Sequence, residues 1–142
     1  MPRIVFDCLI DQPAARHLIE RIDALTALLV RDNVVYSAHV DHQPQSPQPD
    51  SVREELTTTY LRDRGAETAD ELSDDVVALD ELSLQRFTIV VDGLNGSLNE
   101  TAMTYSRLLT PAARLSNDAL DLTDEQRYEV PAAYPWTVFV SA

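Results

Sequence analysis

Three possible metal ligands, His39, Asp41 and His42, lie within four consecutive residues and form the densest such group in the chain. Zinc is bound by imidazole and carboxylate groups, and a site needs three or four ligands held by supporting partners. On a strand, His39 and Asp41 share one face while His42 points to the other, so the three converge only if the strand bends. We therefore interpret them as polar residues at a strand end, with a metal site as the alternative.

Two other segments could carry chemistry, and both favour a structural interpretation. Residues 93–97, Gly-Leu-Asn-Gly-Ser, precede a predicted helix, whose first backbone N–H groups could hold an anion. The glycine spacing fits neither the dinucleotide nor the phosphate-loop motif, and the flanking Asp92 and Glu100 would repel an anion. Cys8, the single cysteine, falls inside a predicted strand, where a thiol normally packs as a small apolar side chain. We expect no catalytic residues, no cofactor and no disulfide within the chain.

A ligand pocket between sheet and helices, as in a dimeric α+β barrel, is an alternative interpretation. Its lining would be aromatic and polar. Four residues have that character: Tyr36, His39, Tyr105 and Trp136. Under this alternative the protein binds or transforms a small molecule.

The charge balance restricts the possible partners. The chain carries 24 acidic and 11 basic residues, a formal net charge of −13, and every basic residue is arginine. A surface this negative repels nucleic-acid phosphates and anionic lipids, so we expect no direct binding to nucleic acid or membranes. Adaptation to molar salt, a GC-rich genome, or mimicry of nucleic acid that blocks a DNA-binding protein would each account for this composition.

Hydrophobic periodicity predicts a mixed α and β chain. Alternation with a period of two predicts four strands, at residues 3–10, 34–40, 86–92 and 136–141. Apolar spacings of three and four, with capping residues, predict helices at residues 12–31, from Ser51 to Gly65, from Thr68 to Leu79, and after Ser97. One more turn is expected at residues 110–116, and irregular structure at 118–130. Residues 43–50 hold three prolines and are expected to form an extended arm.

This order of elements predicts an α+β ferredoxin-like split βαβ two-layer sandwich, with a four-stranded antiparallel sheet and a helical insertion between the second and third strands. We expect one domain over residues 1–142, with an arm at 43–50 and an acidic helical insertion at 51–85. The expected core is Phe6, Leu18, Ile22, Leu25, Leu29, Ile89, Val91 and Val138.

The second face of this sheet is half apolar. Its expected residues are Val5, Asp7, Leu9, Val35, Ser37, His39, Thr88, Val90, Thr137 and Phe139. Such a face is normally covered by a second subunit or by an insertion of the same chain. The insertion itself carries a run of carboxylates without a basic residue, Glu67, Asp70, Glu71, Asp74, Asp75, Asp80 and Glu81. We interpret this run as a solvated face, with a docking surface for a basic partner or loose cation binding as alternatives.

Together these features favour a non-enzymatic, self-associating structural or assembly protein from a halophilic or GC-rich source. A virion or tail-completion component is one concrete form, and the partners are then further copies of the chain or another protein. The arm is expected to contact a neighbouring chain, or to be a surface loop. The small-molecule-binding barrel and the acidic nucleic-acid mimic stay open as alternatives. We expect a cytoplasmic protein, or a virion protein if it is viral, because no apolar run could span a membrane and no secretory leader is visible.

Overall fold

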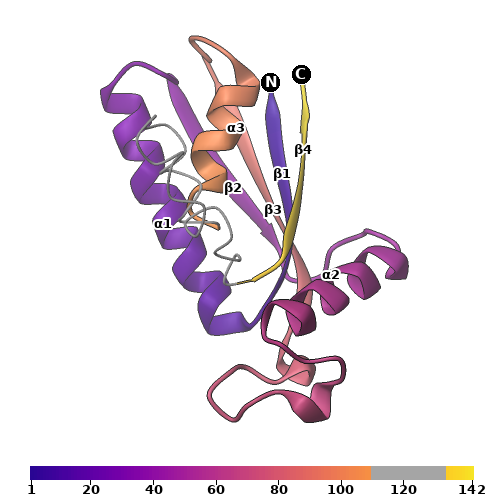
Figure 1. The fold of residues 1–142 in the computed structure, drawn as a ribbon. Helices are drawn as coiled ribbons and strands as arrows, with labels where there is room; N and C mark the ends of the chain where they lie inside the picture. Colours follow the sequence, from indigo (N-terminus) through magenta and orange to yellow (C-terminus); the bar gives the residue numbers. More distant parts are fainter. Residues whose placement is uncertain (110–133) are drawn as a thin grey trace, which may run out of the picture.

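A four-stranded antiparallel sheet in the order β2-β3-β1-β4 organises the protein, which is described by a computed structural model (Figure 1). The structure describes residues 1–109 and 134–142. Its strands are β1 (Arg3–Ile10), β2 (Ser37–Gln43), β3 (Ser83–Asp92) and β4 (Trp136–Ser141). Its helices are α1 (Gln12–Arg31), α2 (Asp50–Asp63) and α3 (Leu98–Ser106), with short 3-10 turns η1 (Ala69–Glu71) and η2 (Leu79–Glu81). The predicted α+β, ferredoxin-like arrangement is confirmed. The turn and irregular segment predicted within 110–130 lie outside the described residues.

The main core lies between the sheet and helices α1 and α3, which cover the same face (Figure 1). Alternate β1 side chains point into this layer and are at most 2 % exposed: Ile4, Phe6, Cys8 and Ile10. They pack against Leu18, Ile22 and Leu29 of α1 and against Ala102 and Tyr105 of α3. Most of the predicted core is therefore confirmed.

Leu25 is only partly buried against this core, and Val138 departs further from the prediction, because it is 41 % exposed. β4 is an edge strand, and it contacts only β1 within the sheet. A groove therefore separates β4 from α3, and Val138 lines that groove instead of filling the core. The prediction that Val138 is buried is wrong.

Helix α1 begins and ends at the predicted residues. The backbone N–H of Ala14 donates to Asp11 Oδ2 at 3.2 Å, so Asp11 caps the helix, and Pro13 lies in the first turn, where its missing N–H costs nothing. Arg31 lies in the last turn, where a cation interacts favourably with the helix dipole. Asn33 then turns the chain with a φ of 61°.

Strand β2 lies later in the chain than predicted, at residues 37–43 instead of 34–40. The N–H groups of Val34 and Val35 both donate to the Leu29 carbonyl, which draws this segment onto the end of α1. Val35 is 2 % exposed and belongs to the core beneath α1, so its predicted place on the second face is wrong.

The insertion contributes one α-helix, α2, instead of two. A small second core joins α2 to the opposite face of the sheet and contains Leu9, Leu56, Tyr60, Leu82 and Leu84. The second face is therefore partly covered by the chain's own insertion.

Two helix starts in the insertion differ from the prediction. Helix α2 begins at Asp50 behind Pro49, without a side-chain cap, so Ser51 lies inside the helix instead of capping it. The predicted helix from Thr68 is absent in the structure, where only the short turns η1 and η2 form. We attribute this to like charge, because the run of carboxylates at residues 67–81 is exposed throughout and would stack repelling groups along one helix.

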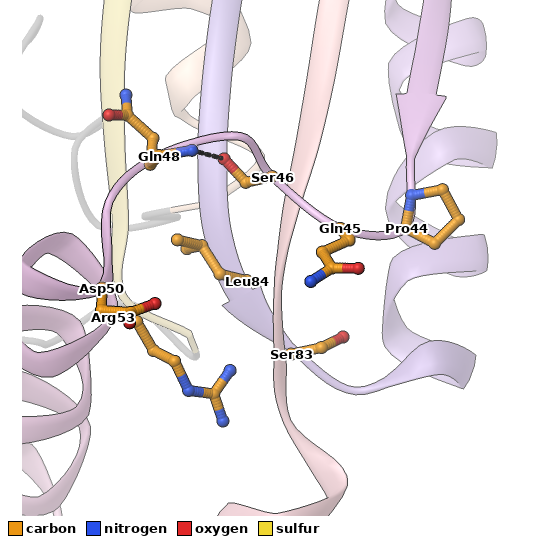
Figure 2. A pocket seen from close by; sticks show the side chains of 8 residues that line it. All are labelled: Pro44, Gln45, Ser46, Gln48, Asp50, Arg53, Ser83 and Leu84. Atoms are coloured by element: carbon orange, nitrogen blue, oxygen red, sulfur yellow. Dashed lines mark hydrogen bonds between the residues drawn. The ribbon is translucent and has the colours of Figure 1, made fainter.

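The arm at residues 43–50 crosses the second face of its own sheet and leads into α2 (Figure 2). The Ser46 N–H donates to the Leu84 carbonyl of β3 at 2.7 Å. The Ser46 hydroxyl and the Gln48 amide both donate to Asp7 of β1. The sheet itself therefore orders the arm, and a contact with a neighbouring chain stays a prediction.

Candidate functional site

The three predicted metal ligands occupy two faces of β2. His39 and Asp41 lie on the exposed face, with His39 Nε2 3.7 Å from Asp41 Oδ2. His42 points to the other side, where its ring stacks on Phe87 at 4.9 Å between centroids. Among the residues that the structure describes, no group of three or more His, Cys, Asp or Glu side chains could hold a metal ion.

The four residues expected to line a ligand pocket do not meet. Tyr36 is 77 % exposed, and His39 lies on the exposed face of β2. Tyr105 is buried on the helix side of the sheet, and its hydroxyl is 2.5 Å from Thr26 Oγ1 of α1. Trp136 packs edge-on against Phe6, with 5.7 Å between the ring centroids. Tyr105 and Thr26 form a hydrogen bond that joins α3 to α1.

The most tightly connected polar cluster in the described residues is centred on Asp7, a residue of the second sheet face. Its side chain is fully buried, although it belongs to a strand of apolar residues. Four donors surround it: Arg86 Nε at 2.9 Å, Arg86 Nη2 at 3.1 Å, Ser46 Oγ at 2.6 Å and Gln48 Nε2 at 3.1 Å. We call Asp7, Arg86, Ser46 and Gln48 the Asp7 cluster. Each carboxylate oxygen accepts two hydrogen bonds, so the buried charge is fully compensated.

The surroundings of Asp7 keep it ionised. Burial alone raises the pKa of the Asp7 carboxyl, but hydrogen bonds from Arg86, Ser46 and Gln48, together with the positive charge of Arg86, outweigh burial and lower it below its usual value. A general acid or base at neutral pH needs the opposite shift, toward the working pH. The hydrogen bonds from Ser46 and Gln48 and the lowered pKa therefore indicate a structural role for Asp7, which holds the arm on the sheet.

A pocket of about 230 Å³ lies beside the Asp7 cluster, between the arm and the start of α2 (Figure 2). Figure 2 shows Ser46 and Gln48 at its upper rim and Asp50 and Arg53 on α2 at its side. Arg53 Nη2 donates to the Leu82 carbonyl at 3.3 Å. The pocket therefore contains one carboxylate, from Asp50, and one guanidinium, from Arg53, which already donates to Leu82. With one charge of each sign, the lining favours neither an anionic nor a cationic ligand.

A second buried polar group, Gln85, faces the helix layer at a β3 position opposite Cys8. Its Nε2 donates to the Ile10 carbonyl at 3.2 Å and to Ser83 Oγ at 3.0 Å. Its Oε1 lies 2.6 Å from His42 Nε2 and acts as the acceptor, because an amide oxygen cannot donate. This network positions the end of β2 against the core.

Sequence reasoning placed Asp7 on the second face but missed the cluster around it. A signal was present, because a charged residue inside an apolar strand must find a partner if it is buried. Arg86 was the basic residue at the start of a predicted strand, which made it the natural candidate. The contributions of Ser46 and Gln48 could not be found this way, because they depend on the path of the arm.

Cys8 is buried as expected. Burial and the nearby charge of Asp7 both raise the pKa of its thiol far above the usual range, so the thiolate does not form near neutral pH.

The fold and the Asp7 cluster define a two-layer α+β protein whose central buried charge is internally satisfied. Comparisons with known protein families, with curated proteins and with solved structures found no match to this chain. Within residues 1–109 and 134–142, no helix combines the length and apolar character needed to cross a bilayer.

Proposed function

We propose that this chain is a structural protein that acts by associating with further copies of itself. The observation that carries this proposal is the distribution of exposed apolar side chains. Met103 of α3 is 62 % exposed, and Val138 and Phe139 of β4 are 41 % and 44 % exposed. Met103 and Val138 line one groove of about 360 Å³ on the helix side of β4. The Phe139 ring lies on the other face of the same strand, 5.3 Å from the Arg86 guanidinium. Exposed apolar side chains that gather around one strand are typical of interaction sites.

The polar residues support the same proposal. The Asp7 carboxylate accepts four hydrogen bonds from its own chain, and Gln85 and Tyr105 are likewise engaged in internal hydrogen bonds. These groups therefore stabilise the fold, whereas the exposed apolar residues are available for binding.

The composition favours a particular setting for such an assembly. A net charge of −13 with arginine as the only basic residue type suits a halophilic or GC-rich source, since carboxylates keep a protein hydrated in concentrated salt. A virion or tail-completion component, or a cytoplasmic assembly, is the form of this proposal that we favour.

Sedimentation of the full chain over a range of protein and salt concentrations tests the proposal. We expect a mass that is a multiple of 15.9 kDa, with association growing stronger as salt screens the acidic surfaces. A mass of 15.9 kDa at every concentration, in dilute and in molar salt, would contradict self-association.

A further inference from the structure

The outer edge of β4 carries backbone groups that the sheet leaves available. The Leu9 N–H donates to the Pro135 carbonyl at 3.0 Å, which makes these two residues a hydrogen-bonded pair in the register of β1 and β4. In an antiparallel ladder, hydrogen-bonded and non-hydrogen-bonded pairs alternate. Thr137, Phe139 and Ser141 therefore bond to β1, while Val138 and Val140 direct their N–H and C=O groups outward.

The other neighbour of β1 confirms this alternation. The Val91 N–H donates to the Pro2 carbonyl at 2.9 Å, so the even-numbered residues of β1 bond to β3. The odd-numbered residues of β1 are then left for β4, in agreement with the Leu9 bond. Within the described residues, no hydrogen bond from outside the sheet reaches the backbone of Val138 or Val140.

Among the residues that the structure describes, β4 itself carries none of the side-chain devices that normally block strand addition. Proteins protect exposed edges with charged side chains, prolines or bulges, yet β4 has the sequence Trp-Thr-Val-Phe-Val-Ser, without a charge or a proline. The opposite edge of the sheet is different, because β2 carries Asp41 together with two histidines. In a chain with 24 acidic residues, an uncharged strand at one edge is a distinct feature.

We propose that β4 pairs with β4 of a second copy, antiparallel, about a two-fold axis that passes beside Val138. This inference rests on the proposed function and names its interface. Because Val138 directs its backbone outward, it can exchange both hydrogen bonds with Val138 of the second copy, which is the geometry that a two-fold axis requires. The strand is thus complementary to itself.

Charge makes the β4 edge the least repulsive place for a second copy to bind, and it directs a basic partner elsewhere. Two copies that each carry −13 repel one another, and they approach with least repulsion where neither presents a carboxylate. The β4 edge meets that condition, since no charged side chain lies in the strand. A basic partner would instead be attracted to the exposed carboxylates at residues 67–81.

The groove beside β4 adds apolar burial to this pairing. The axis is perpendicular to the sheet, so both copies place α3 on the same side of one continuous sheet. Met103 of each copy then lies beside the junction, where its exposed side chain can cover the paired strands. Val138 residues from the two copies lie directly opposite each other and form a β-branched cross-strand pair.

Charge reversal at Val138 tests this interface. Val138→Glu places two carboxylates opposite each other at the axis, and we expect the dissociation constant to rise by about a hundredfold. Val30→Glu is the matched control, because Val30 is equally exposed at 40 % but lies on α1, and we expect it to associate like the parent. Circular dichroism and urea unfolding would show that both variants keep the parent's fold.

Mixing two variants adds a test of the register. Val138→Glu and Val138→Arg should each remain monomeric alone, whereas an equimolar mixture should form heterodimers, since opposite charges then meet at the axis. Recovery in the mixture would support the two-fold pairing directly. A parent protein that associates equally well with Val138→Glu would overturn the β4 interface while leaving self-association intact.

Two other outcomes would also decide the matter. A monomeric parent chain would overturn both the interface and the proposed function. A Val138→Glu variant that loses folding stability instead of association would show that another segment of the chain occupies the edge, and it would overturn the interface alone.

Discussion

The guanidinium of Arg86 donates two hydrogen bonds to the Asp7 carboxylate from the position directly opposite on the neighbouring strand, Nε to Oδ1 at 2.9 Å and Nη2 to Oδ2 at 3.1 Å. Paired bonds of this kind fix both side chains in one geometry. The two carboxylate oxygens still accept from Ser46 and Gln48. The ion pair therefore forms the attachment point through which the proline-rich arm is held on the sheet.

Asp7→Asn should destabilise the fold by about 3–5 kcal/mol, because Arg86, whose side chain is only 17 % exposed, then keeps a charge without a counter-charge. Urea unfolding measures this cost. The exposed Asp41→Asn, on the same sheet face, is the control and should change stability by less than about 0.5 kcal/mol. The pair of substitutions Asp7→Leu and Arg86→Met should recover much of the loss, since no charge stays buried. Equal effects of Asp7→Asn and Asp41→Asn would contradict the role of the cluster.

The stabilisation by Asp7 should disappear in acid. Its folded-state pKa lies below the usual value of 3.8, so the ionised carboxylate stabilises the fold above that pH and loses this contribution as the pH falls through the folded-state pKa. The difference in unfolding free energy between the parent and Asp7→Asn should therefore be constant near neutral pH and shrink below 3.8. A difference that persisted unchanged in strong acid would show that the carboxylate charge is not its source.

Tyr105→Phe should cost about 1–3 kcal/mol, because it removes the 2.5 Å hydrogen bond to Thr26 and leaves a buried threonine hydroxyl without its partner. Tyr36→Phe removes the same hydroxyl from a side chain that is 77 % exposed, and it should be nearly neutral. Thermal unfolding of the two variants side by side measures the contrast. Similar melting temperatures for both would count against the bond between α1 and α3.

Gly93→Ala should destabilise the protein more than Gly65→Ala. Both glycines have positive φ, 65° and 71°, so both variants incur backbone strain. An added Cβ at Gly93 would also lie 2.5 Å from Tyr36 Cβ, whereas the space around Gly65 is open. The difference in unfolding free energy between the two variants therefore measures the close approach of Tyr36 to the β3–α3 turn, and a zero difference would contradict it.

Molar sodium chloride should raise the melting temperature of the full chain. Screening weakens the repulsion among its 24 acidic residues, which outnumber 11 arginines. Sucrose, which is also excluded from protein surfaces but does not screen charge, is the control and should give a smaller rise. A melting temperature that did not respond to salt would leave genome composition as the better account of the missing lysine.

Local sequence signals predicted the elements that depend on local physics. Helix α1 needed only an amphipathic stripe, the Asp11 cap and the Pro13 start, and the structure has it at the predicted residues. Strand β4 was likewise predictable, because the residues directly after Pro135 are mostly β-branched or aromatic. From these elements and their order, the fold class could be derived.

Features that depend on tertiary contacts could not be derived in the same way. Ser51 and Thr68 both begin apparent capping boxes, yet neither caps an α-helix, because Pro49 sets the start of α2 and like charges oppose a helix at Thr68. The exposure of Val138 depends on the groove between α3 and β4, which forms only in the tertiary structure. The Asp7 cluster forms only because the arm crosses the sheet beside Asp7. The sequence of the arm does not by itself predict that path.

The central position of β1 has a consequence for the order of folding. This strand occurs first in the chain, yet its two ladder partners are β3 and β4, and Arg3 is paired with Ser141. Each pairing brings together residues that are far apart in the sequence. The chain therefore loses the conformational entropy of a long loop before β1 gains its ladder hydrogen bonds. During synthesis, β1 therefore leaves the ribosome long before either neighbour exists. We expect folding to be slow for a chain of this size and to be completed only when residues 136–141 join the sheet.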